Sequence, residues 1–323
     1  MTDSLPRPSR ETVSNEEIPP RPVRVIAAEA VADIDRSIAV LRGWGVRVLE
    51  DSRLHKARDV LRHAAETSVL VPKHRGDYLG LRSLELAFDY AAIADTLPSE
   101  LVAALRRELR DSLIGEIDPP EAARGPLQLQ SQAIVRAAFV RGGVQPTHPT
   151  HSSQRGVSSP DLLLDDGARK YAIEAKRPQE ARNIIARFDE GCAQVSSYGL
   201  TGGVIVDVTD ALRKVARAVI GEEVRRVALT LYDRVFVDGQ GHKPGREHII
   251  VAGAFARVAW SLLDEGEESA MVDVNMTSCV GILVSAPGTN EDRRARWIRT
   301  HLQDGLEQLN RTLAETTPSD EAT

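Results

Sequence analysis

Two carboxylates and one lysine lie within a short segment that runs from Pro160-Asp161 to Glu174-Ala175-Lys176. Carboxylate and carbonyl oxygens are the ligands that Mg²⁺ prefers, so Asp161, Glu174 and the backbone carbonyl of Ala175 are candidate metal ligands. A bound divalent cation acidifies its water ligand and neutralises charge that develops on a phosphate. Lys176 can orient or help to deprotonate that water, and its ammonium can stabilise the transition state. These residues predict metal-dependent hydrolysis of a phosphodiester.

A β-hairpin is the element expected to position these groups. Residues 162–164 form a short apolar run, residues 165–167 (Asp-Asp-Gly) are typical of a tight turn, and residues 170–176 alternate polar and apolar side chains. Side chains alternate between the two faces of a strand, so Glu174 and Lys176 should project to the same face. The aspartate that precedes the first strand can reach the same point.

The pattern Pro160-Asp161 followed by Glu174-Ala175-Lys176 resembles the signature of the PD-(D/E)xK nuclease superfamily, which has the restriction-endonuclease-like fold. A second motif lies downstream, because Gln194 and Tyr198 resemble the Q-x-x-x-Y motif that follows the catalytic strand in RecB-type members. Residues four apart share a face of a helix, so both side chains can point at one site. Pro-Asp occurs once in the chain, and Lys176 is the only lysine with an acid two residues before it. Both facts argue against the alternative of an ordinary exposed hairpin.

The resemblance implies a nuclease that requires Mg²⁺, for which Mn²⁺ can substitute. We expect nucleic acid as the substrate, with DNA favoured, and products with 5′-phosphate and 3′-hydroxyl ends. The implied catalytic residues are Asp161, Glu174, Lys176, Gln194 and Tyr198. The implied metal ligands are Asp161, Glu174 and the carbonyl of Ala175.

Many members of this superfamily carry a further acidic ligand on the first core helix, and this chain departs from that pattern. The helix predicted over residues 127–140 offers Gln128, Gln130 and Gln132 but no acid. We choose Gln132 for this position, and a solvent-facing glutamine is the alternative. The missing acid argues against a second metal ion more than it argues against catalysis.

Several basic residues near the hairpin are candidate ligands of phosphate or metal. Arg177 follows the catalytic lysine and Arg187 lies two helical turns before Gln194, so both could hold phosphates; a surface salt bridge is the alternative for Arg187. His148 and His151 lie in a Pro/Thr-rich loop, which favours solvated histidines over metal ligands. A basic cluster farther along is more typical of a solvated helix face than of a DNA contact. Its members are Arg213, Lys214, Arg217, Arg225 and Arg226.

Composition narrows the class of protein. The chain has 323 residues, 42% of them hydrophobic, which is enough for one large domain or two ordinary ones. A net charge of -6 argues against non-specific coating of nucleic acid. Cys192 and Cys279 are too few for a disulfide framework, a zinc site or an iron–sulfur cluster. No segment resembles a signal peptide or a membrane span, so we expect a cytoplasmic protein.

The expected fold class is α/β. A restriction-endonuclease-like core, with a central mixed sheet flanked by helices, is predicted over residues 119–313. It follows a small α/β or mostly helical N-terminal module over residues 23–118, and residues 1–22 and 314–323 are expected to be disordered tails. Strands are expected over residues 23–27, 46–49, 162–164, 170–176, 203–208, 227–237, 271–274 and 280–285. Helices are expected over residues 33–41, 53–65, 81–94, 99–114, 127–140, 178–198, 210–226, 247–264 and 290–313.

Two functions from different classes remain open. The first is a Mg²⁺-dependent nuclease whose N-terminal module recruits substrate or a protein partner, and a restriction or anti-phage context is suggested by analogy. The second is a catalytically silent or partner-gated subunit that binds nucleic acid or assembles with other proteins. In that case the N-terminal module would self-associate or sense a signal. The pairing of two carboxylates with a lysine favours the first function, since a purely structural hairpin does not require it.

Overall fold

The central feature of the computed structural model is a five-stranded mixed sheet with the strand order β2-β3-β4-β5-β7. The structure describes residues 21–70, 79–119, 123, 125–149, 159–213, 220–237, 246, 248–258, 271–272, 277–284 and 290–315. The strands of the sheet are β2 (Leu162–Asp165), β3 (Lys170–Lys176), β4 (Gly202–Asp207), β5 (Ile249–Val258) and β7 (Thr277–Val284). β3, β4 and β5 are parallel, whereas β2 and β7 run antiparallel to their neighbours. The carboxyl ends of the three parallel strands therefore meet at one edge of the sheet.

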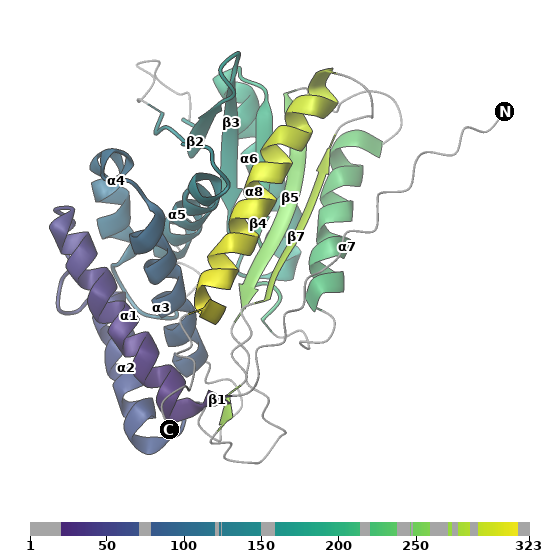
Figure 1. Cartoon of the computed structure of the whole chain (residues 1–323). Coiled ribbons are helices and arrows are strands. Elements are labelled where there is room, and N and C mark those ends of the chain that lie inside the picture. The colour runs from purple at the N-terminus through teal and green to yellow at the C-terminus, as the bar shows by residue number, and fades with distance from the viewer. Residues whose placement is uncertain are drawn as a thin grey trace.

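Helices cover both faces of this sheet (Figure 1). α5 (Gly125–Arg141) and α8 (Asn290–Glu315) lie on one face, and α6 (Ile184–Tyr198) and α7 (Ile220–Tyr232) lie on the other. The order α5, β2, β3, α6, β4 is the helix-strand-strand-helix-strand order that the sequence predicts. No helix in the described residues is long and apolar enough to cross a membrane.

The N-terminal region is helical. It contains α1 (Val23–Gly43), α2 (Arg53–Thr67), α3 (Leu79–Thr96) and α4 (Ser99–Ser112) (Figure 1). α3 and α4 pack on α5, and α1 and α2 pack on α3. The short strands β1 (Arg21–Pro22) and β6 (Met271–Val272) pair with each other. Residues 21–22 belong to β1 and residues 314–315 to the end of α8, and the rest of the two tails expected to be disordered lies outside the described residues.

The strand predictions at residues 23–27 and 46–49 are wrong. Val23, Ile26 and Ala27 are buried at helical spacing inside α1, so tertiary packing outweighs the β preference of their side chains. Val46 and Val48 are buried as alternation predicts, but no partner strand among the described residues pairs with them.

Three assignments in the second half of the chain are also corrected. Residues 227–237 belong to α7 and to a π-helical turn, η4 (Asp233–Val237), because Val224, Val227 and Leu231 recur at helical spacing on its buried face. Residues 249–258, expected to be helical, are β5, whose ten residues are all buried between β4 and β7. A continuous apolar run does not distinguish a buried strand from a buried helix. The helix expected from residue 210 is assigned only from Ile220, and residues 214–219 lie outside the described part.

The hairpin forms as predicted, and its turn shows why. Leu162 pairs with Ile173 and Asp165 pairs with Lys170. The carboxylate of Asp166 accepts the backbone N–H groups of Ala168 at 2.9 Å and Arg169 at 2.7 Å, which closes the turn. Successive residues of each strand then alternate between two apolar clusters, one against α5 and α8 and the other against α6 and α7.

α8 buries the predicted stripe and packs closely on α5. Ile298, Leu302, Leu306 and Leu309 are at most 1% exposed. A Cβ built on Gly305 of α8 would overlap the carbonyl oxygen of Ala138 in α5. The two backbones meet there, and neither can yield as a flexible side chain would.

We therefore expect Gly305→Ala to lower the free energy of unfolding by about 1–3 kcal/mol, the usual cost of overpacking. Gly43→Ala at the end of α1 is the matched control, because its added Cβ would meet nothing within 4 Å. That variant should be neutral or slightly stabilising, since alanine is the better helix former. Urea denaturation compares the two, and equal stabilities would show that α8 does not pack this closely on α5.

Candidate active site

Asp161 and Glu174 lie opposite each other at the end of the hairpin. Asp161 directly precedes β2, whose first residue pairs with Ile173, and this register places it beside Glu174 on β3. The backbone N–H of Ala175 donates to Asp161 Oδ2 at 2.8 Å. Gln132 from α5 donates through Nε2 to the other carboxylate oxygen. The hairpin and the first core helix thus hold the Asp161 carboxylate from two sides.

Glu174 and Lys176 project together toward α6, as strand alternation predicts. Glu174 is 0% exposed and Lys176 is 6% exposed. Lys176 Nζ lies 2.9 Å from Glu174 Oε2. Even so, neither Glu174 oxygen accepts a hydrogen bond of ordinary geometry from the described residues. A buried carboxylate with unused lone pairs is free to bind a cation.

α6 supplies two polar side chains to the lysine, one helical turn apart. Gln194 Oε1 accepts a hydrogen bond from Lys176 Nζ, and Glu190 Oε1 lies 3.7 Å from the same nitrogen. The helix comes close enough because residue 191 is glycine: a Cβ there would lie 2.7 Å from a Val204 methyl and 3.4 Å from Lys176 Cε. The lysine therefore passes beneath α6 at this glycine.

Gln128 holds the backbone of β3. Its Nε2 donates to the carbonyl of Ala175, the carbonyl predicted to be a metal ligand, and its Oε1 accepts the N–H of Arg177 at 2.9 Å. The Ala175 carbonyl has a second lone pair that remains available. Gln128 and Gln132 are four apart and share the helix face that meets the hairpin, so neither is the solvent-facing glutamine of the alternative interpretation.

Arg136, one turn beyond Gln132, supports the same aspartate. Its Nη2 donates to the backbone carbonyl of Asp161, and its Nη1 lies 2.8 Å from Glu108 on α4. His148 Nδ1 lies 3.6 Å from Glu108, so this histidine stands behind the site and not among the ligands. The second loop histidine, His151, lies outside the described residues.

Burial and mutual repulsion define the electrostatics of the two carboxylates. Burial and the neighbouring Asp161 raise the pKa of Glu174 from 4.5 to about 8, against the opposing influence of the Lys176 ammonium. Burial likewise raises the pKa of Asp161, while Lys176 and the N–H of Ala175 act to lower it. One ammonium does not compensate two buried carboxylates, and a divalent cation would.

The donor set fits Mg²⁺ or Mn²⁺ with water completing the coordination shell. The described residues contain no group of three or more His, Cys, Asp or Glu side chains that could hold a metal. Mg²⁺ is commonly held by only one or two carboxylates and keeps several waters, so Asp161, Glu174 and the carbonyl of Ala175 suffice. Gln132 approaches the same aspartate from α5, and its amide oxygen is a weaker ligand than a carboxylate.

Tyr198 and Arg187, both predicted at the site, take other contacts. Tyr198 is half-buried and packs against the apolar cluster under α6 and α7. It lies one turn beyond Gln194, toward the start of β4 and away from Lys176. Arg187 forms a salt bridge with Glu190 at 2.5 Å, which is the alternative that the sequence left open.

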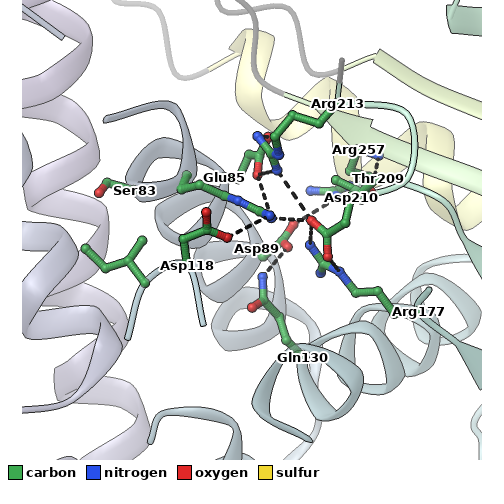
Figure 2. A network of polar contacts seen from close by, with 12 residues as sticks. Ser83, Glu85, Asp89, Asp118, Gln130, Arg177, Thr209, Asp210, Arg213 and Arg257 are labelled. Atoms are coloured by element: carbon green, nitrogen blue, oxygen red, sulfur yellow. Dashed lines mark hydrogen bonds and ion pairs between the residues drawn. The ribbon is translucent and has the colours of Figure 1, made fainter. Parts of the chain in front are cut away.

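Arg177, the second predicted phosphate ligand, is buried and turned away from the site. Its guanidinium lies 2.9 Å from Asp210 (Figure 2). It also lies 3.4 Å from Asp207. Arg177 therefore makes a structural contact with these aspartates where the sequence predicts a contact with phosphate. In the basic cluster, Arg213 is buried as well, whereas Arg225 and Arg226 lie on the exposed face of α7. Lys214 and Arg217 lie outside the described residues.

The residues that the sequence reasoning missed are Gln128 as a backbone clamp, Arg136 and Glu190. Only Glu190 left a usable signal, because it lies four residues before Gln194 and so shares its helix face.

No family model matches the chain, and neither a curated protein nor a solved structure matches it significantly.

The raised pKa of Glu174 predicts how stability depends on pH without metal. The native protein keeps a proton that the unfolded chain releases, so the free energy of unfolding should fall as pH rises from about 4.5 to about 8. Glu174→Gln removes that ionisation. In EDTA at about pH 8, it should be more stable than the wild type by at least about 1.4 kcal/mol, the equivalent of one pKa unit.

Thermal melts in EDTA across this pH range test the prediction. The control is Glu180→Gln, which changes a partly exposed acid in the loop after β3 that pairs with Arg182. Mn²⁺ should restore the stability of the wild type and leave Glu174→Gln unchanged. If the wild type gains stability between pH 5 and 8 in EDTA, the two carboxylates do not repel each other as described.

Proposed function

We propose that this protein is a Mg²⁺-dependent nuclease that hydrolyses phosphodiester bonds, with DNA as the favoured substrate. The observation that carries the proposal is the pair of buried carboxylates, Asp161 and Glu174, beside the ammonium of Lys176 at the end of one hairpin. Such a pair is costly to bury unless it binds a cation. The sequence resemblance to PD-(D/E)xK nucleases supports the same chemistry.

Each side chain has a distinct task in this proposal. Asp161 and Glu174 hold the cation together with the Ala175 carbonyl. When bound, the cation acidifies a water ligand and neutralises charge on the phosphate. Lys176 orients or deprotonates the attacking water and stabilises the added negative charge. Gln194 accepts a hydrogen bond from the lysine and so fixes the direction of its ammonium.

The arrangement of elements is compatible with the proposed restriction-endonuclease-like core. The candidate ligands come from a hairpin inside a mixed sheet, and the helix that follows β3 returns over the site. The RecB-type resemblance is supported at Gln194 and not at Tyr198. Products with 5′-phosphate and 3′-hydroxyl ends, a cytoplasmic location and a role in defence against phage remain parts of the proposal that rest on resemblance or analogy.

One observation favours the second candidate, a silent or partner-gated form of the same site. Lys176 is 6% exposed and contacts Glu174, Glu190 and Gln194 at once. A phosphate must displace at least one of these contacts to reach the ammonium. A gated enzyme would bind metal alone but cut only when a substrate or a partner opens α6 over the lysine.

The nuclease proposal is tested by pairing metal binding with cleavage. Asp161→Asn and Glu174→Gln should each remove Mn²⁺ binding in calorimetry and cleavage of linear and circular DNA, because each removes a ligand charge from a two-carboxylate site. Glu180→Gln should behave like the wild type. Metal binding without cleavage by the wild type would favour the gated form. Unchanged Mn²⁺ affinity in both site variants would exclude this site as the metal centre.

Gln194 and Tyr198 make a matched pair on one helix face. Gln194→Ala should slow single-turnover cleavage by roughly tenfold to a hundredfold, because loss of positioning can cost that much. Tyr198→Phe should cleave at the wild-type rate, since its ring packs on apolar side chains. Thermal melts must show both variants folded. The reverse pattern, with a slow Tyr198→Phe and an unaffected Gln194→Ala, would overturn this division of roles.

A further inference from the structure

A buried ion network joins the N-terminal helices to the edge of the sheet where β3, β4 and β5 end. From α3 it takes Arg82, Glu85 and Asp89, which are three and four residues apart and so share one helix face. Figure 2 shows Glu85 and Asp89 facing the residues of the sheet edge. The members from the sheet edge are Arg177 after β3, Asp207 and Asp210 at and after β4, Arg213, and Arg257 in β5.

Asp210 is the point where the two sides meet. Arg177 Nε and Nη2 donate to its carboxylate at 2.9 Å and 3.2 Å, and Arg82 Nη1 from α3 donates to the same group. Arg213 lies 3.6 Å from it and binds Glu85 of α3 through both terminal nitrogens. Although burial alone would raise the pKa of Asp210, Arg177 and Arg82 hold it well below its usual range.

A second branch of the network runs through α5, the helix whose side chains contact the candidate metal ligands on the hairpin. Gln130 of α5 donates to Asp89 Oδ2 at 2.7 Å, while its neighbours Gln128 and Gln132 contact the hairpin. Arg257 donates to the other oxygen of Asp89 at 3.0 Å. α5 is therefore fixed to α3 on one side and to the metal site on the other.

Charge balance separates this network from a ligand site. Its four arginines, Arg82, Arg177, Arg213 and Arg257, face four buried acids, Glu85, Asp89, Asp207 and Asp210, with the half-exposed Asp118 at its rim. The charges of these eight buried residues balance, so the network itself has no net positive charge to attract a phosphate. The network therefore has a structural role, which is to hold the end of β3 in place.

We propose that Arg177 is a positioning residue through which α3 sets the geometry of the metal site. This inference rests on the nuclease proposed above, and it assigns a role in catalysis to the N-terminal helices. Arg177 directly follows Lys176, and its guanidinium fork spans Asp207 and Asp210. Its backbone N–H is held by Gln128, which also holds Ala175. A shift of the fork would therefore move Lys176 and the Ala175 carbonyl relative to Asp161.

The test compares two conservative variants of the full chain. Arg177→Lys keeps the charge but cannot span both aspartates, because lysine has one compact donor group. Arg213→Lys makes the same change in the same network, but Arg213 contacts Glu85 and Asp210, so its loss leaves the fork of Arg177 in place. We expect Mn²⁺ affinity to fall tenfold to a hundredfold in Arg177→Lys, as for other outer-shell changes, and to fall less in Arg213→Lys.

Amide hydrogen exchange tests the same inference by a measurement that does not depend on metal binding. Amides of residues 174–177 should exchange faster in Arg177→Lys, and the increase should be smaller in Arg213→Lys. If the wild type binds no Mn²⁺, the nuclease proposal fails, and exchange alone still decides whether Arg177 holds the strand. Wild-type exchange and affinity in Arg177→Lys, or equal losses in both variants, would overturn the inference.

Arg82→Lys covers the case in which Arg177→Lys does not fold. It loosens the hold of α3 on Asp210 and leaves the contact between Arg177 and Asp210 in place. The same loss of Mn²⁺ affinity, smaller in size, is expected with faster exchange at residues 174–177. An unchanged Arg82→Lys would show that α3 does not act on the site.

Discussion

Two like-charged carboxylates buried side by side are the constraint around which the rest of this fold is arranged. Asp161 and Glu174 repel each other, and burial removes the water that would screen them. The backbone N–H of Ala175, the amide of Gln132 and the ammonium of Lys176 each offset part of that cost. None of these is a second full charge, so the site retains a negative excess that suits a divalent cation.

The ion network behind β3 is balanced in charge, whereas the site has an excess of negative charge. Arginines and acids are matched there in number, and the fork of Arg177 spans two aspartates. A balanced, well hydrogen-bonded cluster holds its parts in one geometry and attracts no ligand. The two neighbouring residues Lys176 and Arg177 therefore do different work: the first faces the unbalanced site, and the second fixes the strand that carries it.

The hairpin was accessible from the sequence because its signals are local. Asp166 closes the turn with its own carboxylate, and strand alternation alone places Glu174 and Lys176 on one face. Gln194 was accessible because a helix face follows from spacing. The contacts of Gln128 and Arg136 were not, since they depend on how α5 meets the hairpin across more than twenty residues of chain. Arg177 was misplaced for the same reason: its partner Asp210 is brought near only by the parallel pairing of β3 and β4. The apolar run of β5 was assigned to a helix because a strand buried on both faces has no alternation to reveal it.

Anomalous diffraction from crystals soaked in Mn²⁺ tests the central claim most directly, namely that the buried carboxylates form a metal centre. The account predicts a manganese peak within about 2.0–2.6 Å of oxygens from both Asp161 and Glu174, with the Ala175 carbonyl and waters around it. Its signal should vanish in Glu174→Gln crystals of the same form. Ordered manganese elsewhere, with the two carboxylates bonded only to Lys176 and Gln132, would contradict the account.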